Sequence, residues 1–402
     1  MTAEPPFGSL PARVVVAGGG IAAIELVVAL RKLAGERVEI ELLAPGDDLV
    51  YRPLLVAEPF DAGAVQRFPL AEILADQQAG RHAGRLAEVR AGAHEAVADD
   101  GTALPYDALA IVIGALPAGS FPGALNFGEP AEVELFTQLL ARAESGMLRR
   151  VVFALPDELA TWPLPLYELA LMTAARVPSA EIVLVTPEST PLAMFGPAGS
   201  EAVAAQLSRA GIEFRPDAVP ERFENATLTL LGGDTLAADA VVAVPRLRVP
   251  PLSGLPQGDH GFIATDELSR VEGLADVYAA GDVTAFPVKQ GGVSVRQAQA
   301  AATCIAARAG APVAPEPFEP VLRGMMLTGS APSYLESAAG GSLSAESPLW
   351  WPPTKIADSY LVPYLLTRFR LAVPSAGERL VDLVSSAPAG EPVPARPARP
   401  PA

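Results

Sequence analysis

The stretch Arg13–Glu25 reads RVVVAGGGIAAIE and decides the fold of the first part of the chain. An apolar strand runs into three glycines, and a helix is expected to follow. The small residues Gly18, Gly20 and Ala23 have the G-x-G-x-x-A spacing of the dinucleotide-binding fingerprint. The first glycine makes the tight turn, the second lets the backbone approach a pyrophosphate, and the third small residue lets helix and strand pack closely.

A pyrophosphate would lie at the N-terminus of this helix, where free N–H groups and the helix dipole favour negative charge. The residues expected to bind it are Gly18, Gly19, Gly20, Ile21, Ala22 and Ala23. A carboxylate at the end of the next strand usually binds the adenine ribose. That strand, VEIELLAP at Val38–Pro45, places Ala44 at this position, whereas Glu39 and Glu41 alternate with apolar residues. The sequence therefore predicts a nucleotide site without the usual ribose carboxylate.

Composition limits the classes of function that need considering. The 402 residues suffice for two to three domains, and the net charge of −17 argues against a nucleic-acid partner. One cysteine excludes a disulfide framework, and the three histidines show no metal-ligand spacing. The opening MTAEPPF lacks the features of a signal peptide, and no apolar run approaches the roughly 20 residues that span a bilayer. We expect a cytoplasmic protein without a transmembrane segment or a metal.

Further strands and turns follow the first motif. Tyr106–Ala115 reads YDALAIVIGA, a continuous apolar run typical of a parallel strand that is covered on both faces. A second α/β unit begins at Arg150 with RVVFALP, and a short strand is expected at Gly261–Ile263. Val277–Gly292 reads VYAAGDVTAFPVKQGG and leads into an alanine-rich helix expected at Val295–Ala307. This order of elements predicts an α/β fold.

Three separated features together resemble a known family: the glycine turn, the strand ending at Gly114, and VYAAGD at Val277–Asp282. They are similar to the pyridine nucleotide-disulfide oxidoreductase-like flavoproteins, in particular to the sulfide:quinone oxidoreductase and type II NADH dehydrogenase family. The resemblance covers about residues 13–310. It implies FAD as cofactor and an α/β fold of the glutathione reductase type, with two Rossmann-like dinucleotide-binding domains. The implied parts are an FAD-binding domain at 13–148 and 272–315, an inserted degenerate NAD(P)-binding-like domain at 149–271, a C-terminal interface segment at 316–385, and a disordered tail at 386–402.

The resemblance also implies roles for single residues at the flavin. Asp282 would bind ribityl hydroxyls, with Gly281 allowing the backbone to approach, and Gly114 matches a family A-T-G motif whose first two residues are replaced here. The loop VYRPLL would place Arg52 and Pro53 beneath the isoalloxazine. The alternatives are a turn or helix-capping role for Asp282 and an ordinary buried loop around Pro53.

Two charged residues are implied as catalytic. In PVKQGG, Lys289 would lie near flavin N1 and O2, where a cation stabilises reduced flavin, and Gln290 would lie beside it. Glu168 aligns with a glutamate that lies near the flavin and the quinone in type II dehydrogenases. The alternatives are an exposed lysine and a carboxylate on the helix surface. Of the two glutamines in the quinone motif of those enzymes, only Gln297 has a counterpart.

The second α/β unit lacks the features of a working NADH site. Its strand is followed by FALPDELATWPLPLYELA at Phe153–Ala170, without a glycine turn, and Trp162 would occupy the pyrophosphate position. Thr186 stands where an acidic ribose partner is expected, although Glu188 is close. The only cysteine, Cys304, lies in the alanine-rich helix and is expected to be a small core residue.

The leading hypothesis is an FAD-dependent oxidoreductase without redox cysteines and without an efficient NADH site. Its partners would be a small-molecule electron donor and a small-molecule acceptor, with a quinone as the candidate acceptor. One alternative is an NAD(P)H:quinone oxidoreductase with an altered nucleotide loop, and another is a flavin-binding partner protein without turnover. Trp350 and Trp351 in PLWWPP could contact a membrane surface or cap the flavin, or they could pack a domain or homodimer interface.

Overall fold

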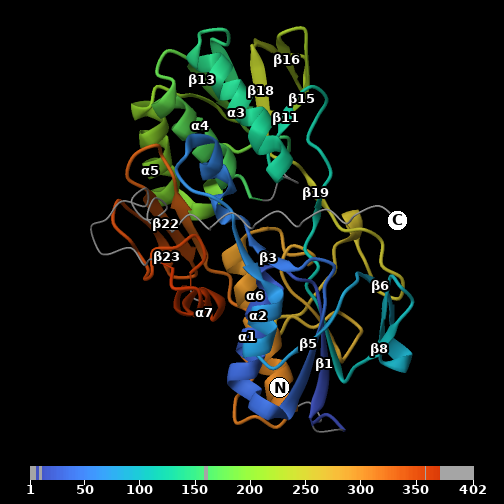
Figure 1. Ribbon diagram of the computed structural model, residues 1–402. Helices are drawn as coiled ribbons and strands as arrows, with labels where there is room; N and C mark the ends of the chain where they lie inside the picture. Colours follow the sequence, from blue (N-terminus) through green and yellow to red (C-terminus); the bar gives the residue numbers. More distant parts are fainter. Residues whose placement is uncertain (1–5, 9–10, 158–161, 358, 372–402) are drawn as a thin grey trace, which may run out of the picture.

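The computed structural model describes residues 6–8, 11–157, 162–357 and 359–371 (Figure 1). Its first sheet contains five parallel strands in the order β20-β9-β1-β2-β5. Their bounds are Ala12–Ala17 for β1, Val38–Leu43 for β2, Gly80–His82 for β5, Ala108–Ile111 for β9 and Val277–Ala279 for β20. Because β20 comes from late in the chain and pairs with β9, the sheet joins segments that are far apart in sequence.

Two helices pack against each other on this sheet, α1 (Ile21–Ala34) and α6 (Gly291–Arg308). Both bury alanines, including Ala23 in α1 and Ala302 in α6, so that their backbones can approach closely. Helix α6 begins at Gly291, earlier than the sequence predicts, because the Gln290 side chain accepts a 2.9 Å hydrogen bond from the Val293 N–H. A cap of this kind satisfies one of the free donors in the first turn.

Smaller elements surround the first sheet. They are β3 (Asp48–Tyr51), β4 (Gln66–Pro69), α2 (Leu70–Asp76), β6 (Leu86–Arg90), β7 (Glu95–Ala98), β8 (Ala103–Pro105) and 3-10 helices at Gly35–Arg37, Arg52–Phe60 and Ala91–Ala93. β3 and β4 form one antiparallel pair, and β6, β7 and β8 form an antiparallel sheet.

A second parallel sheet has the order β11-β18-β12-β13-β14. Its strands are β11 (Leu125–Asn126), β12 (Arg150–Ala154), β13 (Glu181–Val185), β14 (Glu213–Arg215) and β18 (Ala240–Ala243). Side chains alternate along β12, so that Val151 and Phe153 pack with the helices, while Val152 and Ala154 face the opposite layer. The helices are α3 (Pro130–Glu144), α4 (Leu164–Arg176) and α5 (Gly196–Arg209), with a 3-10 turn at Ala193–Phe195.

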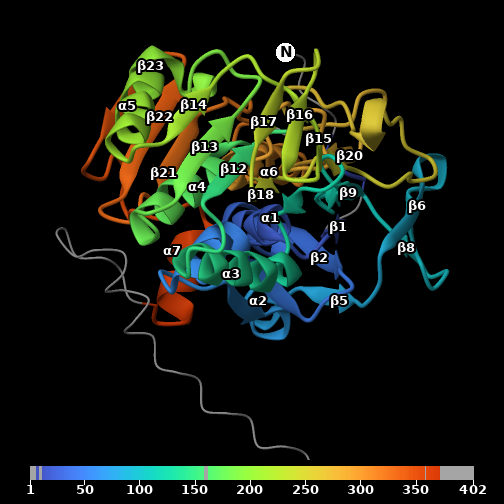
Figure 2. The same cartoon turned by 90° about the horizontal axis from the view of Figure 1, so that it is seen from above.

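The opposite layer is an antiparallel sheet of β15 (Pro220–Glu224), β16 (Thr227–Leu230) and β17 (Thr235–Ala237). Figure 2 shows these strands on the side of the second sheet away from α3. Helices on one face of a parallel sheet and a small β-layer on the other suit a dinucleotide-type domain. The predicted α/β class with two such domains is therefore confirmed.

One predicted strand is wrong. Instead of a strand at Gly261–Ile263, the chain forms a 3-10 turn at Asp259–Gly261, and Ile263 makes only an isolated bridge to Thr284. His260 and Gly261 both have positive φ, at 56° and 84°, which bends the chain out of the extended conformation.

The two-stranded pair β10 (Leu116–Pro117) and β19 (Leu247–Arg248) lies between the two large sheets.

The C-terminal segment contacts both halves of the molecule. It contains the antiparallel strands β21 (Leu322–Met326), β22 (Ser333–Ala338) and β23 (Gly341–Ala345), and helix α7 (Leu361–Arg368). In Figures 1 and 2, β22 and β23 lie beside α5, whereas α7 lies towards α1. The predicted disordered tail at 386–402 lies outside the described residues. Among the described residues, no helix is long and apolar enough to cross a bilayer, and no cluster of metal-ligating side chains occurs.

Candidate flavin site

The predicted motifs meet at one edge of the first sheet. The strand residues Ala17, Leu43, Ile111 and Ala279 lie in one row across β1, β2, β9 and β20. Each predicted motif begins within three residues of the end of its strand. The glycine turn, Gly114 and the Gly281–Asp282 pair are thereby brought to the carboxyl edge, where open α/β sheets bind ligands.

The glycine turn requires glycine at its first position. Gly18 has a φ of +133°, and a Cβ there would approach the Val112 carbonyl oxygen to 2.2 Å. Its N–H donates a 2.9 Å hydrogen bond to the Leu43 carbonyl, which fixes the turn against β2. At Gly20, by contrast, a Cβ would meet no atom within 4 Å, and the residue is exposed. The turn therefore leaves open space directly over the start of α1.

The N-terminus of α1 is suited to bind an anion. Gly20 is the N-cap residue, no side chain caps the helix, and its first turn contains no acidic residue. The first intrahelical bond runs from the Ile24 N–H to the Gly20 carbonyl at 3.1 Å. The N–H groups of Ile21, Ala22 and Ala23 precede it and point toward the open space, as an N-terminal pyrophosphate requires. This arrangement fits the phosphate part of FAD.

A buried network holds the Gly281–Asp282 turn. The Gly281 N–H donates to Gln297 Oε1 at 2.8 Å, and Gln297 Nε2 lies 3.2 Å from Thr284 Oγ1. Thr284 Oγ1 in turn donates to the Gly281 carbonyl at 2.9 Å. Gln297, which the sequence places at the first glutamine of a quinone motif, is 2 % exposed and has its amide committed to this turn. Its position favours a structural role over contact with a quinone.

Asp282 lies beside two cations. Burial raises the pKa of the Asp282 carboxyl, and the charges of Lys289 and Arg52 counteract part of this rise. A carboxylate in such surroundings gains from the donors that ribityl hydroxyls would supply. Gly281 has a φ of +82°, so the turn that presents Asp282 also favours glycine.

Lys289 is a buried lysine, which rules out the exposed alternative. It is 7 % exposed, and its ammonium donates to the Thr284 carbonyl and lies 4.0 Å from the centre of the Phe262 ring. Burial lowers the pKa of Lys289 to about 8, although Asp282 acts in the opposite direction. Lys289 is therefore a buried cation close to Asp282 with a pKa of about 8.

The other predicted contacts are placed as follows. Gln290 uses its side chain within the protein, accepting from Val293 N and donating to the Arg323 carbonyl at 3.0 Å. Arg52 donates to Glu129 at 2.9 Å and is half exposed, and Pro53 follows it at the start of the 3-10 helix. Gly114 has a φ of +72° and open space at its Cβ position. Of these residues, Gln290 is the one whose side-chain oxygen and nitrogen are both hydrogen-bonded within the protein.

Glu168 is not on a helix surface, so that alternative is wrong. Its side chain is 2 % exposed, accepts a 2.8 Å hydrogen bond from the Leu327 N–H, and forms an ion pair with Lys355, whose side chain is 7 % exposed. Burial raises the pKa of Glu168, and the Lys355 charge counteracts part of the rise. Glu168 on α4 thus holds the C-terminal segment through both a backbone and a side-chain contact.

Sequence reasoning missed a second buried carboxylate, Glu25. It is fully buried on α1 and accepts hydrogen bonds from the Tyr360 and Leu361 N–H groups, at 2.9 and 2.8 Å, at the start of α7. Gln299 donates to it at 2.6 Å. A glutamate within the apolar run IAAIELVVAL was the available signal, because a charge in such a run needs partners.

The described residues between β12 and α4 differ from the glycine turn of the first sheet. Helix α4 follows Pro163 and carries Pro165 in its first turn, which removes a donor that a pyrophosphate would use. Trp162 packs 5.9 Å from the Phe195 ring, and Asp157 pairs with Arg246 at 2.7 Å. Residues 158–161 lie outside the described part of the chain.

The acidic residue near the end of β13 is also occupied. Glu188 accepts a 2.7 Å hydrogen bond from the Tyr167 hydroxyl and a 3.2 Å bond from Thr186 Oγ1. The Ala193 N–H donates to its other oxygen at 3.2 Å. Burial raises the pKa of Glu188, and these bonds counteract the rise. The carboxylate that could have held a nicotinamide ribose is therefore bonded within the protein.

Cys304 is 1 % exposed in α6, with its sulfur 3.5 Å from the Tyr278 hydroxyl. It belongs to the core, as predicted, and no second cysteine exists in the sequence to pair with it.

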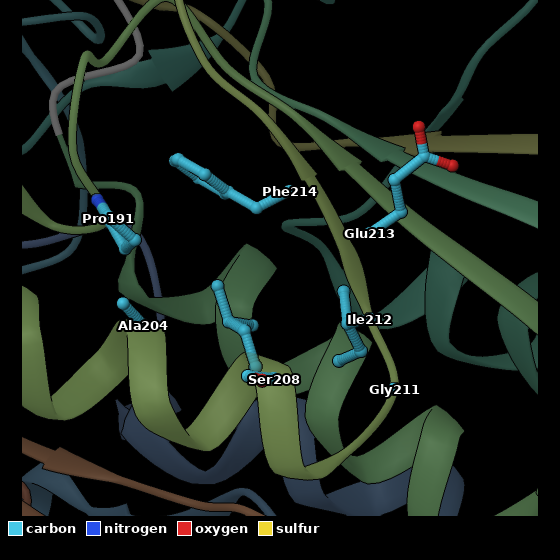
Figure 3. Close-up of a pocket in the computed structure, with 8 residues that line it drawn as sticks. Pro191, Ala204, Ser208, Gly211, Ile212, Glu213 and Phe214 are labelled. Atoms are coloured by element: carbon cyan, nitrogen blue, oxygen red, sulfur yellow. The ribbon is translucent and has the colours of Figure 1, made fainter.

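A separate hollow of about 360 Å³ lies between the C-terminal half of α5 and β14, lined by Pro191, Leu207, Ile212 and Phe214 among others (Figure 3). It is formed by the second sheet and its helix and includes none of the predicted site residues.

Comparison with known proteins agrees with this architecture. Residues 167–303 match the family described as pyridine nucleotide-disulphide oxidoreductase. A comparison with curated protein sequences finds no match. The sulfide:quinone oxidoreductase of Aquifex aeolicus is similar with a TM-score of 0.71 at 16 % identity, over 83 % of this chain and 86 % of that one.

Two other solved structures are similar. The ferredoxin reductase for the CYP199A2 system of Rhodopseudomonas palustris has a TM-score of 0.62 at 22 % identity, covering 81 % of each chain. An NAD-dependent persulfide reductase of A. fulgidus has a TM-score of 0.58 at 17 % identity, over 81 % of this chain and 64 % of that one. At these identities the likeness is one of fold. Together with the family match over residues 167–303, it shows an architecture similar to that of the pyridine nucleotide-disulphide oxidoreductases.

Proposed function

We propose that the protein transfers electrons between a small-molecule donor and a small-molecule acceptor, without thiol chemistry and without NAD(P)H bound at the second sheet. The observation that carries this proposal is the contrast between the two sheets. The first has an open glycine turn and an uncapped helix, whereas the second has prolines at the start of α4 and, near the end of β13, a Glu188 that is bonded within the protein. We also propose the domain boundaries expected from the sequence, with the FAD-binding domain at 13–148 and 272–315 and the inserted domain at 149–271.

FAD at the carboxyl edge would supply two-electron chemistry through its isoalloxazine ring. Residues 18–23 would bind the pyrophosphate, and Gly114 and Gly281 would allow the backbone to approach the cofactor. Asp282 would accept hydrogen bonds from the ribityl hydroxyls. Lys289 would provide a buried positive charge that favours the reduced form, and Arg52 and Pro53 would border the ring.

We propose Glu168 as a positioning residue. It is bonded to Lys355 and Leu327, so it holds the C-terminal segment against α4. That segment continues into Ile356, whose side chain lies where a Cβ on Gly291 would approach it to 2.9 Å, at the start of α6. The segment therefore packs beside the Lys289–Gln290 turn, and Glu168 acts on the site through it.

The proposal has four further parts. The acceptor is a quinone, the protein contacts a membrane peripherally, it forms a homodimer, and it is located in the cytoplasm. Trp351 is 60 % exposed, which supports a contact surface, whereas Trp350 is 8 % exposed and packs 5.2 Å from the Tyr334 ring. The two tryptophans therefore serve different purposes, and only Trp351 is available to a membrane, a quinone-containing surface or a second copy.

Anaerobic stopped-flow spectroscopy tests the proposal. The flavin absorbance of purified holoprotein is followed after mixing with NADH, NADPH or sulfide, and reoxidation is followed with a menaquinone analogue. We expect slow or absent reduction by the nicotinamides. Rapid reduction by micromolar NADH would instead support an NAD(P)H:quinone oxidoreductase with an altered loop, and flavin that no donor reduces would support a partner protein without turnover.

A further inference from the structure

The end of β2 has no polar side chain for the adenosine part of a dinucleotide. Ala44 is fully buried, and a Cβ added to Gly19 would lie 3.1 Å from its methyl group. Its N–H donates to the His82 carbonyl at 3.1 Å, and its carbonyl accepts from the Gly84 N–H at 3.4 Å. Position 44 thus packs against the glycine turn and offers no free group to a ribose.

A carboxylate stands slightly further along the same loop. Asp47 follows Ala44 by three residues, and its side chain is 90 % exposed. Arg81 on β5 donates from Nη2 to Asp47 Oδ1 at 2.9 Å and to the Gly46 carbonyl at 2.6 Å. Among the described residues, no hydrogen bond reaches Asp47 Oδ2. Asp47 is therefore held in place by one oxygen and free at the other.

Arg81 lies on the neighbouring strand, beside the end of β2. Strands β2 and β5 are parallel neighbours with Leu42 opposite Arg81, so Arg81 stands at the same edge of the sheet as Ala44. Its side chain is 23 % exposed, and its Nε is buried without a partner among the described residues. Arg81 therefore acts through Nη2, which holds both the Asp47 carboxylate and the Gly46 carbonyl.

We propose that Asp47, positioned by Arg81, binds the ribose hydroxyls of the FAD adenosine in place of the missing carboxylate at position 44. A carboxylate near the end of the second strand is the group that ordinarily makes this contact. The ion pair orders the loop, so that less side-chain freedom is lost when the ribose binds. The inference rests on FAD binding at this edge of the sheet.

Flavin affinity of the apoprotein tests this directly and needs no enzyme activity. FMN has the isoalloxazine, the ribityl chain and one phosphate of FAD but lacks its adenosine. Titrations of wild type, D47N and R81M with FAD and with FMN, followed by flavin fluorescence, separate the two ends of the cofactor. E39Q is the matched control, because Glu39 is an exposed carboxylate on β2 away from the carboxyl edge.

We expect D47N to weaken FAD binding by about tenfold or more, the loss of one charge-assisted hydrogen bond, while FMN affinity stays within twofold of wild type. R81M should show the same selective loss, and E39Q should match wild type with both flavins. Unchanged FAD affinity in D47N, or equal losses for FAD and FMN, would overturn the inference. Wild-type apoprotein that binds neither flavin would refute the cofactor assignment itself, which is a distinguishable failure.

Discussion

The buried Glu168–Lys355 pair makes a specific prediction about stability. Replacing Lys355 with Met keeps most of the side-chain volume and removes the charge that faces Glu168. Since the two side chains are only 2 % and 7 % exposed, Glu168 would remain as an uncompensated buried carboxylate held by the Leu327 N–H alone. Breaking a buried ion pair at one partner costs about 3–5 kcal/mol, and we expect K355M to lose that much stability near neutral pH.

The pH dependence of this loss has a definite sign. Burial already raises the pKa of folded Glu168 above its usual 4.5, and removing Lys355 raises it further. The folded variant then binds a proton more tightly than the unfolded chain does. Its stability relative to wild type therefore recovers as the pH falls through the raised pKa, and the penalty is largest above it.

Urea unfolding followed by circular dichroism, at about pH 7.5 and about pH 5, measures both effects. The double variant E168Q/K355M removes the charge and keeps an acceptor for Leu327, so it should recover most of the loss. R209M controls for the removal of an exposed cation. Stability of K355M within about 0.5 kcal/mol of R209M, or a penalty that grows toward acid pH, would refute the reasoning.

Three further predictions concern the two nucleotide sites. NADH and NADPH should bind the second sheet about two to four orders of magnitude more weakly than a complete site would, because two charge-assisted hydrogen bonds are lost; isothermal titration with submicromolar binding would contradict this. K289M should lower the two-electron flavin potential by about 30 mV in spectroelectrochemical titration, since one charge at an effective dielectric of about 20 can supply about 1.4 kcal/mol. That difference should shrink above pH 8, because the pKa of Lys289 is about 8, and an unchanged potential with FAD fully bound would place Lys289 away from the ring. Q297A should weaken retention of FAD by loosening the Gly281 turn, whereas Q138A, an exposed glutamine on α3, should retain FAD like wild type; equal retention in both would show that the network is dispensable.

Much of the fold could be predicted from the sequence because its signals are local. The glycine turn, the apolar strands and the Gly-Asp turn each identify a strand end, and parallel pairing then brings strand ends to one edge. The same logic identified the second unit and its missing glycine turn. The predicted strand at Gly261–Ile263 failed because consecutive positive φ values at His260 and Gly261 outweighed its apolar composition.

The roles of buried charges could not be predicted in this way, since they depend on partners far away in sequence. Glu25 meets Tyr360 and Leu361, and Glu168 meets Lys355, across more than 150 residues in each case. Helical spacing alone does not distinguish a buried glutamate from an exposed one. Gln297 was likewise recognisable as a motif position, but its bond to Gly281 depends on how α6 packs against the turn.

The flavin content of the purified protein tests the central claim most directly. The claim is that FAD binds non-covalently at the carboxyl edge of the first sheet, through the open turn at Gly20 and the uncapped start of α1. We expect wild-type protein to be yellow, to release stoichiometric FAD on denaturation, and to lose it when Gly20 is replaced by Val, with folding retained. A colourless wild-type protein that cannot be reconstituted with FAD, or a G20V variant that retains FAD fully, would contradict the account.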